Sequence, residues 1–204
     1  MDRFPTGAVD SSITRQSPRS ASPNHLMDNY KILFAGPVSA GKTTAITSVC
    51  TTPPLTTEAQ ATDISRDSKT TTTVAMDYGT MQLPGIKTLH LYGTPGETRF
   101  DFMWDILSKG STGLVLLIDN THPDPFSELH FFLRAFKKFT KKSRIAIGIT
   151  KTDICITPRI NDYQAQLRNV LPNIPVFSVD ARNQIDVALL IEALVVSLDL
   201  EFAA

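Results

Sequence analysis

One short segment constrains the fold of this chain more than any other: Gly36-Pro37-Val38-Ser39-Ala40-Gly41-Lys42-Thr43. It matches the pattern G-x-x-x-x-G-K-[ST]. The mostly apolar run Tyr30 to Ala35 before it predicts a strand, and residues Lys42 to Cys50 predict a helix. A strand, a tight loop and a helix in this order begin a β-α-β unit, so the segment predicts a parallel sheet covered by helices.

The chemistry of phosphate binding explains this spacing. The backbone N–H groups of such a loop turn inward around a phosphate, and the start of the following helix adds its own unpaired N–H groups. Gly41 allows close backbone approach, Lys42 supplies a charge for the β- and γ-phosphates, and the Thr43 hydroxyl is placed to coordinate Mg²⁺. Residues Gly36 to Thr44 are therefore predicted to bind the phosphates of a nucleotide.

Apolar runs alternate with segments of helical period beyond this loop, which predicts one α/β domain over residues 29–204. Six strands are predicted, at Tyr30–Ala35, Val74–Tyr78, Ile86–Tyr92, Gly113–Ile118, Arg144–Ile149 and Val176–Val179. Five helices are predicted, at Lys42–Cys50, Thr98–Ser108, Pro125–Phe139, Arg159–Val170 and Gln184–Leu200. The expected architecture is the three-layer P-loop NTPase fold, a mostly parallel sheet with helices on both faces.

Two segments carry little apolar material. Residues 1–28 are rich in Ser, Thr, Pro and Arg, which predicts a disordered N-terminal arm. The stretch from Thr51 to Thr73 holds two adjacent prolines and nine threonines, which predicts a long irregular loop. Loops of this length are usually functional.

Composition excludes several classes of partner. Twenty basic and twenty acidic side chains cancel, so nucleic-acid binding is not expected. No run approaches the roughly 18 apolar residues that span a bilayer, and the polar N-terminus predicts a cytoplasmic protein. Position 2 is not glycine and the last residues contain no cysteine, so no direct membrane anchor is expected. Cys50 and Cys155 lie outside any metal or redox motif.

The sequence Thr150-Lys151-Thr152-Asp153 ends a predicted apolar strand, where ligands of open α/β sheets bind. A guanine edge presents N1–H and a 2-amino group as paired donors that the Asp153 carboxylate can accept, whereas adenine offers no such pair there. Hydrogen bonds to charged groups contribute about 1.5–3 kcal/mol, which is enough for a tenfold preference. The alternative is that Asp153 only caps a turn.

The chain resembles the Ras-like small GTPases over residues 30–200. The resemblance rests on the order of a strand, the phosphate loop, the threonine-rich loop, the Thr94-Pro95-Gly96 turn and the T-K-x-D sequence. The chain is most similar to the Arf-like branch and to bacterial relatives of the gliding-motility GTPase MglA, in particular the conservon-type GTPases. The resemblance implies GTP and GDP as ligands, Mg²⁺ as cofactor and a conformation that depends on the γ-phosphate.

The resemblance also assigns switch and catalytic residues, namely Lys42, Thr73, Gly96 and Glu97. Thr73 matches the loop threonine that reaches Mg²⁺, with Thr72 or solvated loop threonines as alternatives. Gly96 matches the glycine whose amide contacts the γ-phosphate. Two departures predict slow hydrolysis: Gly93 replaces an aspartate that supports Mg²⁺, and Glu97 replaces the glutamine that orients water. Glu97 has the alternative role of an exposed carboxylate at a helix start.

On the base side, the resemblance assigns Thr150, Lys151, Asp153 and the segment Asp180-Ala181-Arg182. Thr150 stands where the family has an asparagine, so its contact with the phosphate loop is expected to be weaker. In Asp180-Ala181-Arg182, an alanine amide is expected to face the guanine oxygen.

Phe100, Phe102, Met103 and Trp104 lie within five positions of the helix after Gly96. By the same resemblance, Trp104 and a neighbouring phenylalanine are predicted to form a hydrophobic patch that depends on the nucleotide. The alternative is that all four residues complete the core. Expected partners are a Roadblock-type dimer and an activator or exchange factor.

Three functions are compatible with these residues. A regulatory GTPase is the leading one. An ATP-dependent kinase or transferase is the second, because a phosphate loop does not select the base; such an enzyme should carry a substrate pocket and an arginine-rich lid, and neither is evident in the sequence. The third is an interaction protein that binds a nucleotide with negligible hydrolysis, as Gly93 and Glu97 suggest.

Overall fold

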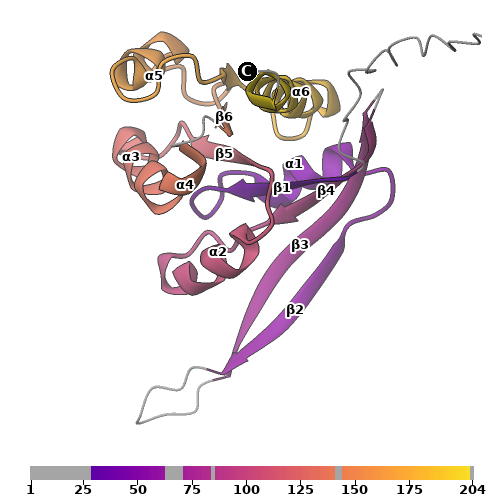
Figure 1. Ribbon diagram of the computed structural model, residues 1–204. Helices are drawn as coiled ribbons and strands as arrows, with labels where there is room; N and C mark the ends of the chain where they lie inside the picture. Colours follow the sequence, from indigo (N-terminus) through magenta and orange to yellow (C-terminus); the bar gives the residue numbers. More distant parts are fainter. Residues whose placement is uncertain (1–28, 63–70, 84–85, 141–143, 203–204) are drawn as a thin grey trace, which may run out of the picture.

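The computed structural model describes residues 29–62, 71–83, 86–140 and 144–202. The expected N-terminal arm, residues 1–28, lies outside them. Within the described residues, seven strands form one sheet in the order β2-β3-β4-β1-β5-β6-β7 (Figure 1). The strands are β1 (Asn29–Ala35), β2 (Leu55–Thr62), β3 (Thr71–Leu83), β4 (Ile86–Gly93), β5 (Gly113–Asp119), β6 (Ile145–Thr150) and β7 (Val176–Ser178). Strands β4, β1, β5, β6 and β7 run parallel, and β3 is antiparallel to both of its neighbours.

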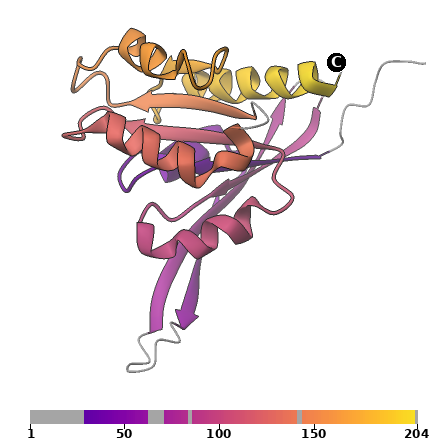
Figure 2. The same cartoon turned by 60° about the vertical axis from the view of Figure 1, so that its left-hand side comes forward.

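Helices cover both faces of the sheet. They are α1 (Lys42–Val49), α2 (Asp101–Ser108) preceded by the 3₁₀ turn η1 (Thr98–Phe100), α3 (Pro125–Ala135), α4 (Lys137–Thr140), α5 (Ile160–Leu167) and α6 (Gln184–Phe202). Helices α1 and α6 pack on one face, and α2 to α5 pack on the other (Figures 1 and 2). The predicted three-layer α/β fold is confirmed. In the described part of the chain, no helix has both the length and the apolar run to cross a bilayer.

Strand β1 shows why the layers form. Ile32 and Phe34 enter the core under α1 and α6, whereas Leu33 and Ala35 enter the core under α2 to α5. This alternation follows from the period of two residues in a strand. Strands β5 and β6 are buried at every position because helices cover them on both sides, which explains their continuous apolar sequences.

Strand β2 was not predicted, and it corrects the interpretation of residues 51–73 as an irregular loop. Leu55–Thr62 pairs antiparallel with β3, from Leu55 opposite Tyr78 to Thr62 opposite Thr71. Threonine is β-branched and favours strands. The strand was missed because it contains few apolar residues and is held by backbone pairing with β3, which an apolar pattern does not indicate. The resulting hairpin extends beyond the rest of the sheet (Figures 1 and 2).

Candidate functional site

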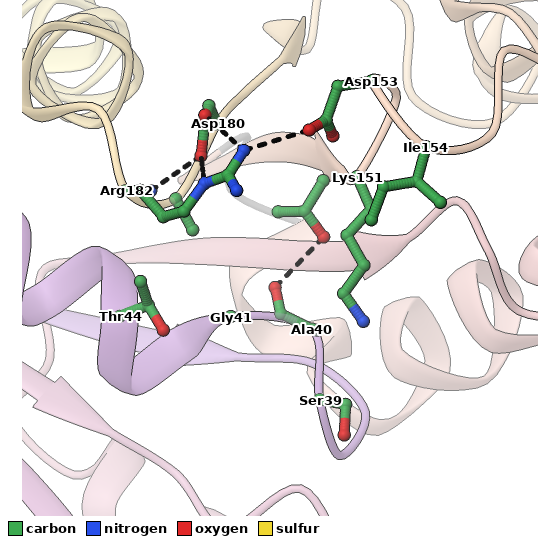
Figure 3. Close-up of a pocket in the computed structure, with 11 residues that line it drawn as sticks. Ser39, Ala40, Gly41, Thr44, Lys151, Asp153, Ile154, Asp180 and Arg182 are labelled. Atoms are coloured by element: carbon green, nitrogen blue, oxygen red, sulfur yellow. Dashed lines mark hydrogen bonds and ion pairs between the residues drawn. The ribbon is translucent and has the colours of Figure 1, made fainter.

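The carboxyl ends of the parallel strands meet at one edge of the sheet, where ligands of α/β proteins usually bind. The phosphate loop follows β1 there, and β4, β5 and β6 end at Gly93, Asp119 and Thr150. A pocket at this edge is lined by Ser39, Ala40, Gly41, Thr44, Thr150, Lys151, Asp153, Ile154, Asp180, Ala181 and Arg182 (Figure 3). All of these except Ile154 were predicted from the sequence. The structure therefore brings the phosphate loop and the predicted base-binding segments to one pocket.

The start of α1 is shaped for an anion. Gly41 precedes the helix with a φ of 89°, a conformation that favours glycine, and a Cβ there would lie 2.9 Å from the Cβ of Ala181. Gly41 offers no side chain to cap the first helical turn. The first N–H groups of α1 are thus open to a phosphate from the side of the pocket.

Lys42 is folded back over the phosphate loop. Its Nζ donates hydrogen bonds to the carbonyl oxygens of Gly36 at 2.9 Å and Pro37 at 2.6 Å. Burial lowers the pKa of the Lys42 ammonium to about 8, although the charge of Asp77 opposes this shift. A phosphate group in the loop would stabilise the ammonium further, because an opposite charge favours the charged form.

The Thr94-Pro95-Gly96 turn lies against the phosphate loop. A Cβ on Gly96 would be 2.6 Å from the backbone nitrogen of Val38 and 2.8 Å from Lys42 Nζ. Only glycine fits at this approach, since the nearest atom belongs to backbone that has little freedom to move. Gly96 is therefore beside Lys42, the residue predicted to carry the phosphate charge. The contact of its amide with the γ-phosphate stays a prediction.

Glu97 lies just outside this contact. Its side chain is exposed, and Oε2 is 2.5 Å from Arg99 Nε. Glu97 immediately precedes η1, so the alternative role as an exposed carboxylate at a helix start agrees with its position. Within the turn, the buried Thr94 hydroxyl has no hydrogen-bond partner among the described residues.

Thr150 connects β6 to the phosphate loop. Its side chain is buried, and the hydroxyl lies 3.1 Å from the carbonyl oxygen of Ala40 and 3.2 Å from that of Ile118. One hydroxyl proton serves these two acceptors. Thr150 therefore contacts the phosphate loop through its hydroxyl. That this contact is weaker than one from asparagine stays a prediction.

Lys151 forms one wall of the pocket. Figure 3 shows its side chain running from the end of β6 toward the phosphate loop. Its Nζ lies 2.5 Å from Asp119 Oδ2. Burial alone would raise the pKa of Asp119, but the hydrogen bonds from Lys151 and Thr121 outweigh burial and hold that pKa below its ordinary value. The sequence analysis did not identify Asp119, which directly follows the predicted strand Gly113–Ile118.

Asp153 lies at the open side of the pocket and is exposed. Arg182 Nη2 donates to Asp153 Oδ2 at 3.0 Å and to Asp180 Oδ2 at 2.8 Å (Figure 3). Among the described residues, Arg182 is the hydrogen-bond partner of the Asp153 carboxylate, so the structure does not support the turn-capping alternative. The Arg182 guanidinium lowers the pKa of Asp180.

Thr43 has a partner that the sequence did not suggest. The Thr43 side chain is exposed, and its hydroxyl donates to Asp77 Oδ2 at 2.5 Å. Thr73 lies four residues before Asp77 in β3, about 13 Å along an extended strand, and pairs with Gln60 in the projecting hairpin. The structure places Asp77 beside Thr43. The contact of Thr73 with Mg²⁺ stays a prediction.

Trp104 corrects the predicted surface patch. It is 5% exposed and packs against Phe132 and Phe136, with ring centroids 5.3 and 5.5 Å apart. Phe100 is also buried, whereas Phe102 is 46% exposed. For Trp104 and Phe100 the core alternative is right. The indole packs against phenylalanines of α3 and its C-terminal end, and the sequence of α2 alone does not indicate these neighbours.

Known proteins share this architecture. The structure is similar to the crystal structure of the G domain of the FeoB iron transporter of T. maritima, with a TM-score of 0.61, 20% identity, and coverage of 83% of this chain and 98% of that domain. At this identity, the similarity shows the fold alone.

The sequence also has a relative and a matching protein family. The uncharacterized protein MJ1339 of Methanocaldococcus jannaschii is 28% identical over 127 residues, which cover 62% of this chain and 73% of that protein. The model of the family described as "conserved hypothetical ATP binding protein" matches residues 51–165. Because this match covers more than half of the chain, the protein belongs to that family of conserved hypothetical ATP binding proteins.

Proposed function

We propose that this chain is a cytoplasmic switch protein that binds GTP and GDP with Mg²⁺ and hydrolyses GTP slowly. The observation that carries the proposal is the Asp153 carboxylate at the open side of a pocket whose other side is the phosphate loop. A guanine in this pocket offers two donors to the carboxylate. Such hydrogen bonds to a charged acceptor contribute about 1.5–3 kcal/mol.

Adenine is the alternative base, because the family description names ATP. The family match includes Thr150 to Asp153 but not the phosphate loop at residues 36–43. At the edge where guanine has N1–H, adenine has an unprotonated nitrogen, an acceptor that faces the Asp153 carboxylate with two lone pairs opposed. The Asp153 carboxylate therefore favours guanine over adenine.

Competition between GTP and ATP for the protein at fixed Mg²⁺ tests this choice. We expect GTP to bind at least about tenfold more tightly than ATP. Equal affinity would refute guanine specificity and support an ATP-dependent enzyme. Lys42→Ala is expected to lose tight binding of both nucleotides, which confirms that competition occurs at the phosphate loop. Identification of the nucleotide that co-purifies with the protein gives an independent answer.

The residues present fit a Mg²⁺ that arrives with the nucleotide. The described part of the chain contains no group of three or more His, Cys, Asp or Glu side chains that could hold a metal by itself. It does contain an exposed hydroxyl at Thr43, at the start of the helix that follows the phosphate loop. Mg²⁺ is usually held by one or two protein oxygens together with phosphates and water. Thr43 would hold the ion, which would neutralise charge on the β- and γ-phosphates.

Two features support a switch with slow hydrolysis. Gly96 lies beside Lys42, where its backbone would meet the γ-phosphate. The Glu97 side chain is paired with Arg99 and lacks the amide of a glutamine, so it is a poor substitute for a residue that orients water. Single-turnover hydrolysis separates a slow GTPase from a nucleotide-binding interaction protein, which would show no turnover. Regulatory partners, among them a Roadblock-type dimer, an activator or an exchange factor, belong to the proposal.

A further inference from the structure

Gly93 ends β4 at the place where the Ras-like resemblance puts a carboxylate that supports Mg²⁺. The structure fills this place from the neighbouring strand. Asp77 of β3 is the cross-strand partner of Gly93. A Cβ built on Gly93 would lie 3.1 Å from both the Cβ and Oδ2 of Asp77, so the Asp77 side chain occupies the space that a side chain at Gly93 would take.

The same carboxylate faces the residue predicted to bind the metal. Asp77 Oδ2 accepts the hydrogen bond from the Thr43 hydroxyl at 2.5 Å. The charge of Asp77 also acts on the phosphate loop, because it opposes the lowering of the Lys42 pKa by burial and so stabilises the ammonium. Mg²⁺ prefers oxygen ligands such as hydroxyls and carboxylates. Thr43, at the start of α1, and Asp77 bring one of each into contact beside the predicted phosphate site.

We propose that Asp77 supplies the protein carboxylate of the Mg²⁺ site, in place of the one that Gly93 lacks. The inference rests on the proposed function, because the ion is expected to come with a nucleotide. It moves the carboxylate from the segment that carries Gly96 to the projecting β2–β3 hairpin. Metal binding is thereby connected to the position of that hairpin.

The test compares GTP affinity in excess Mg²⁺ with GTP affinity in EDTA, measured by calorimetry. Asp77→Asn keeps the shape of the side chain and removes its charge. We expect it to reduce the gain in affinity from Mg²⁺ by about tenfold to a hundredfold, as for other residues that support a bound metal. The readout is the ratio of the two affinities for each variant, because loss of the Asp77 charge also acts on Lys42 and changes the affinity in EDTA. Asp105→Asn, an exposed aspartate of α2 outside the pocket, is the matched control.

A swapped carboxylate provides the second arm of the test. Asp77→Gly alone should lose the effect of Mg²⁺, and the double variant Asp77→Gly with Gly93→Asp should recover it, because the new carboxylate enters the same space. Thermal unfolding of each variant checks that it is folded. A folded double variant that stays insensitive to Mg²⁺ overturns the proposal.

The two proposals fail in different ways. If the parent protein binds GTP no better in Mg²⁺ than in EDTA, the proposed function is wrong. If the parent gains affinity from Mg²⁺ and Asp77→Asn gains as much, only the role of Asp77 is wrong.

Discussion

Arg182 Nη2 donates a hydrogen bond of 3.0 Å to Asp153 Oδ2. The carboxylate that we propose to read guanine therefore shares an exposed guanidinium with Asp180. Exposed ion pairs contribute less than hydrogen bonds between a base and a charged acceptor. A guanine base can thus replace Arg182 as the hydrogen-bond donor to Asp153, or bind the carboxylate together with it, at little cost in free energy.

Asp153→Ala is expected to abolish the preference for GTP over ATP. GTP affinity should fall about tenfold or more, since the paired donors of guanine lose their acceptor. ATP affinity should not fall, because adenine loses only an opposed lone pair. Competition binding at fixed Mg²⁺ measures both. Asp105→Ala, on the exposed surface of α2, should behave like the parent. A preference that survives in Asp153→Ala would show that another group reads the base.

Thr150→Val should weaken the connection between β6 and the phosphate loop. The substitution keeps the shape of the buried side chain and removes the hydroxyl that Ala40 and Ile118 accept from. We expect the free energy of unfolding to fall by about 1 kcal/mol, together with a loss of nucleotide affinity. Chemical denaturation and calorimetry measure the two effects.

Thr152→Val is the control for Thr150, because its hydroxyl contacts Ser178 instead of the phosphate loop. Loss of stability without loss of nucleotide affinity in Thr150→Val would mean that the hydroxyl supports the fold but not the binding site.

The residues that could be predicted from the sequence are those in short contiguous motifs. Gly36 to Thr44 and Thr150 to Asp153 each follow a buried strand, and parallel strands bring their carboxyl ends together whatever the rest of the fold. Their meeting in one pocket therefore follows from local sequence and one rule of topology. Ile154 was missed because an apolar residue after a motif does not indicate which way it points.

The residues that could not be predicted depend on pairing between strands. Asp77 meets Gly93 only because of the antiparallel register of β3 and β4, and that register is set by their hydrophobic faces and by the turn between them. An acidic residue within Val74–Tyr78 was the available signal, but it does not identify its neighbour. The burial of Trp104 likewise depends on Phe132, which lies on another helix.

Glu97→Gln is expected to increase the rate of GTP hydrolysis. The change removes an anion that repels the γ-phosphate and introduces an amide that orients water. The parent rate should be near the roughly 10⁻⁴ s⁻¹ of an unassisted Ras-type protein. Single-turnover assays with Glu192→Gln, an exposed glutamate of α6, as the control measure the difference. A parent rate above about 1 s⁻¹, or a much slower Glu97→Gln variant, would contradict this prediction.

Trp104 should report the state of the Gly96 turn. Its indole Nε1 donates to the carbonyl oxygen of Pro95 at 2.9 Å, and Pro95 directly precedes Gly96. If a γ-phosphate draws the Gly96 amide toward it, the Pro95 carbonyl moves and the hydrogen bond to the indole changes. Trp104 is the single tryptophan of the chain, so its emission can be followed without other signals.

We expect the emission of Trp104 to differ between the GDP complex and the complex with a non-hydrolysable GTP analogue. Gly96→Ala tests the cause, because its Cβ would overlap the backbone nitrogen of Val38 and keep the turn away from the phosphate loop. This variant should bind GDP but show a much smaller difference in emission. If the parent binds both nucleotides with the same emission, the turn does not respond to the γ-phosphate, and the buried indole is only a part of the core.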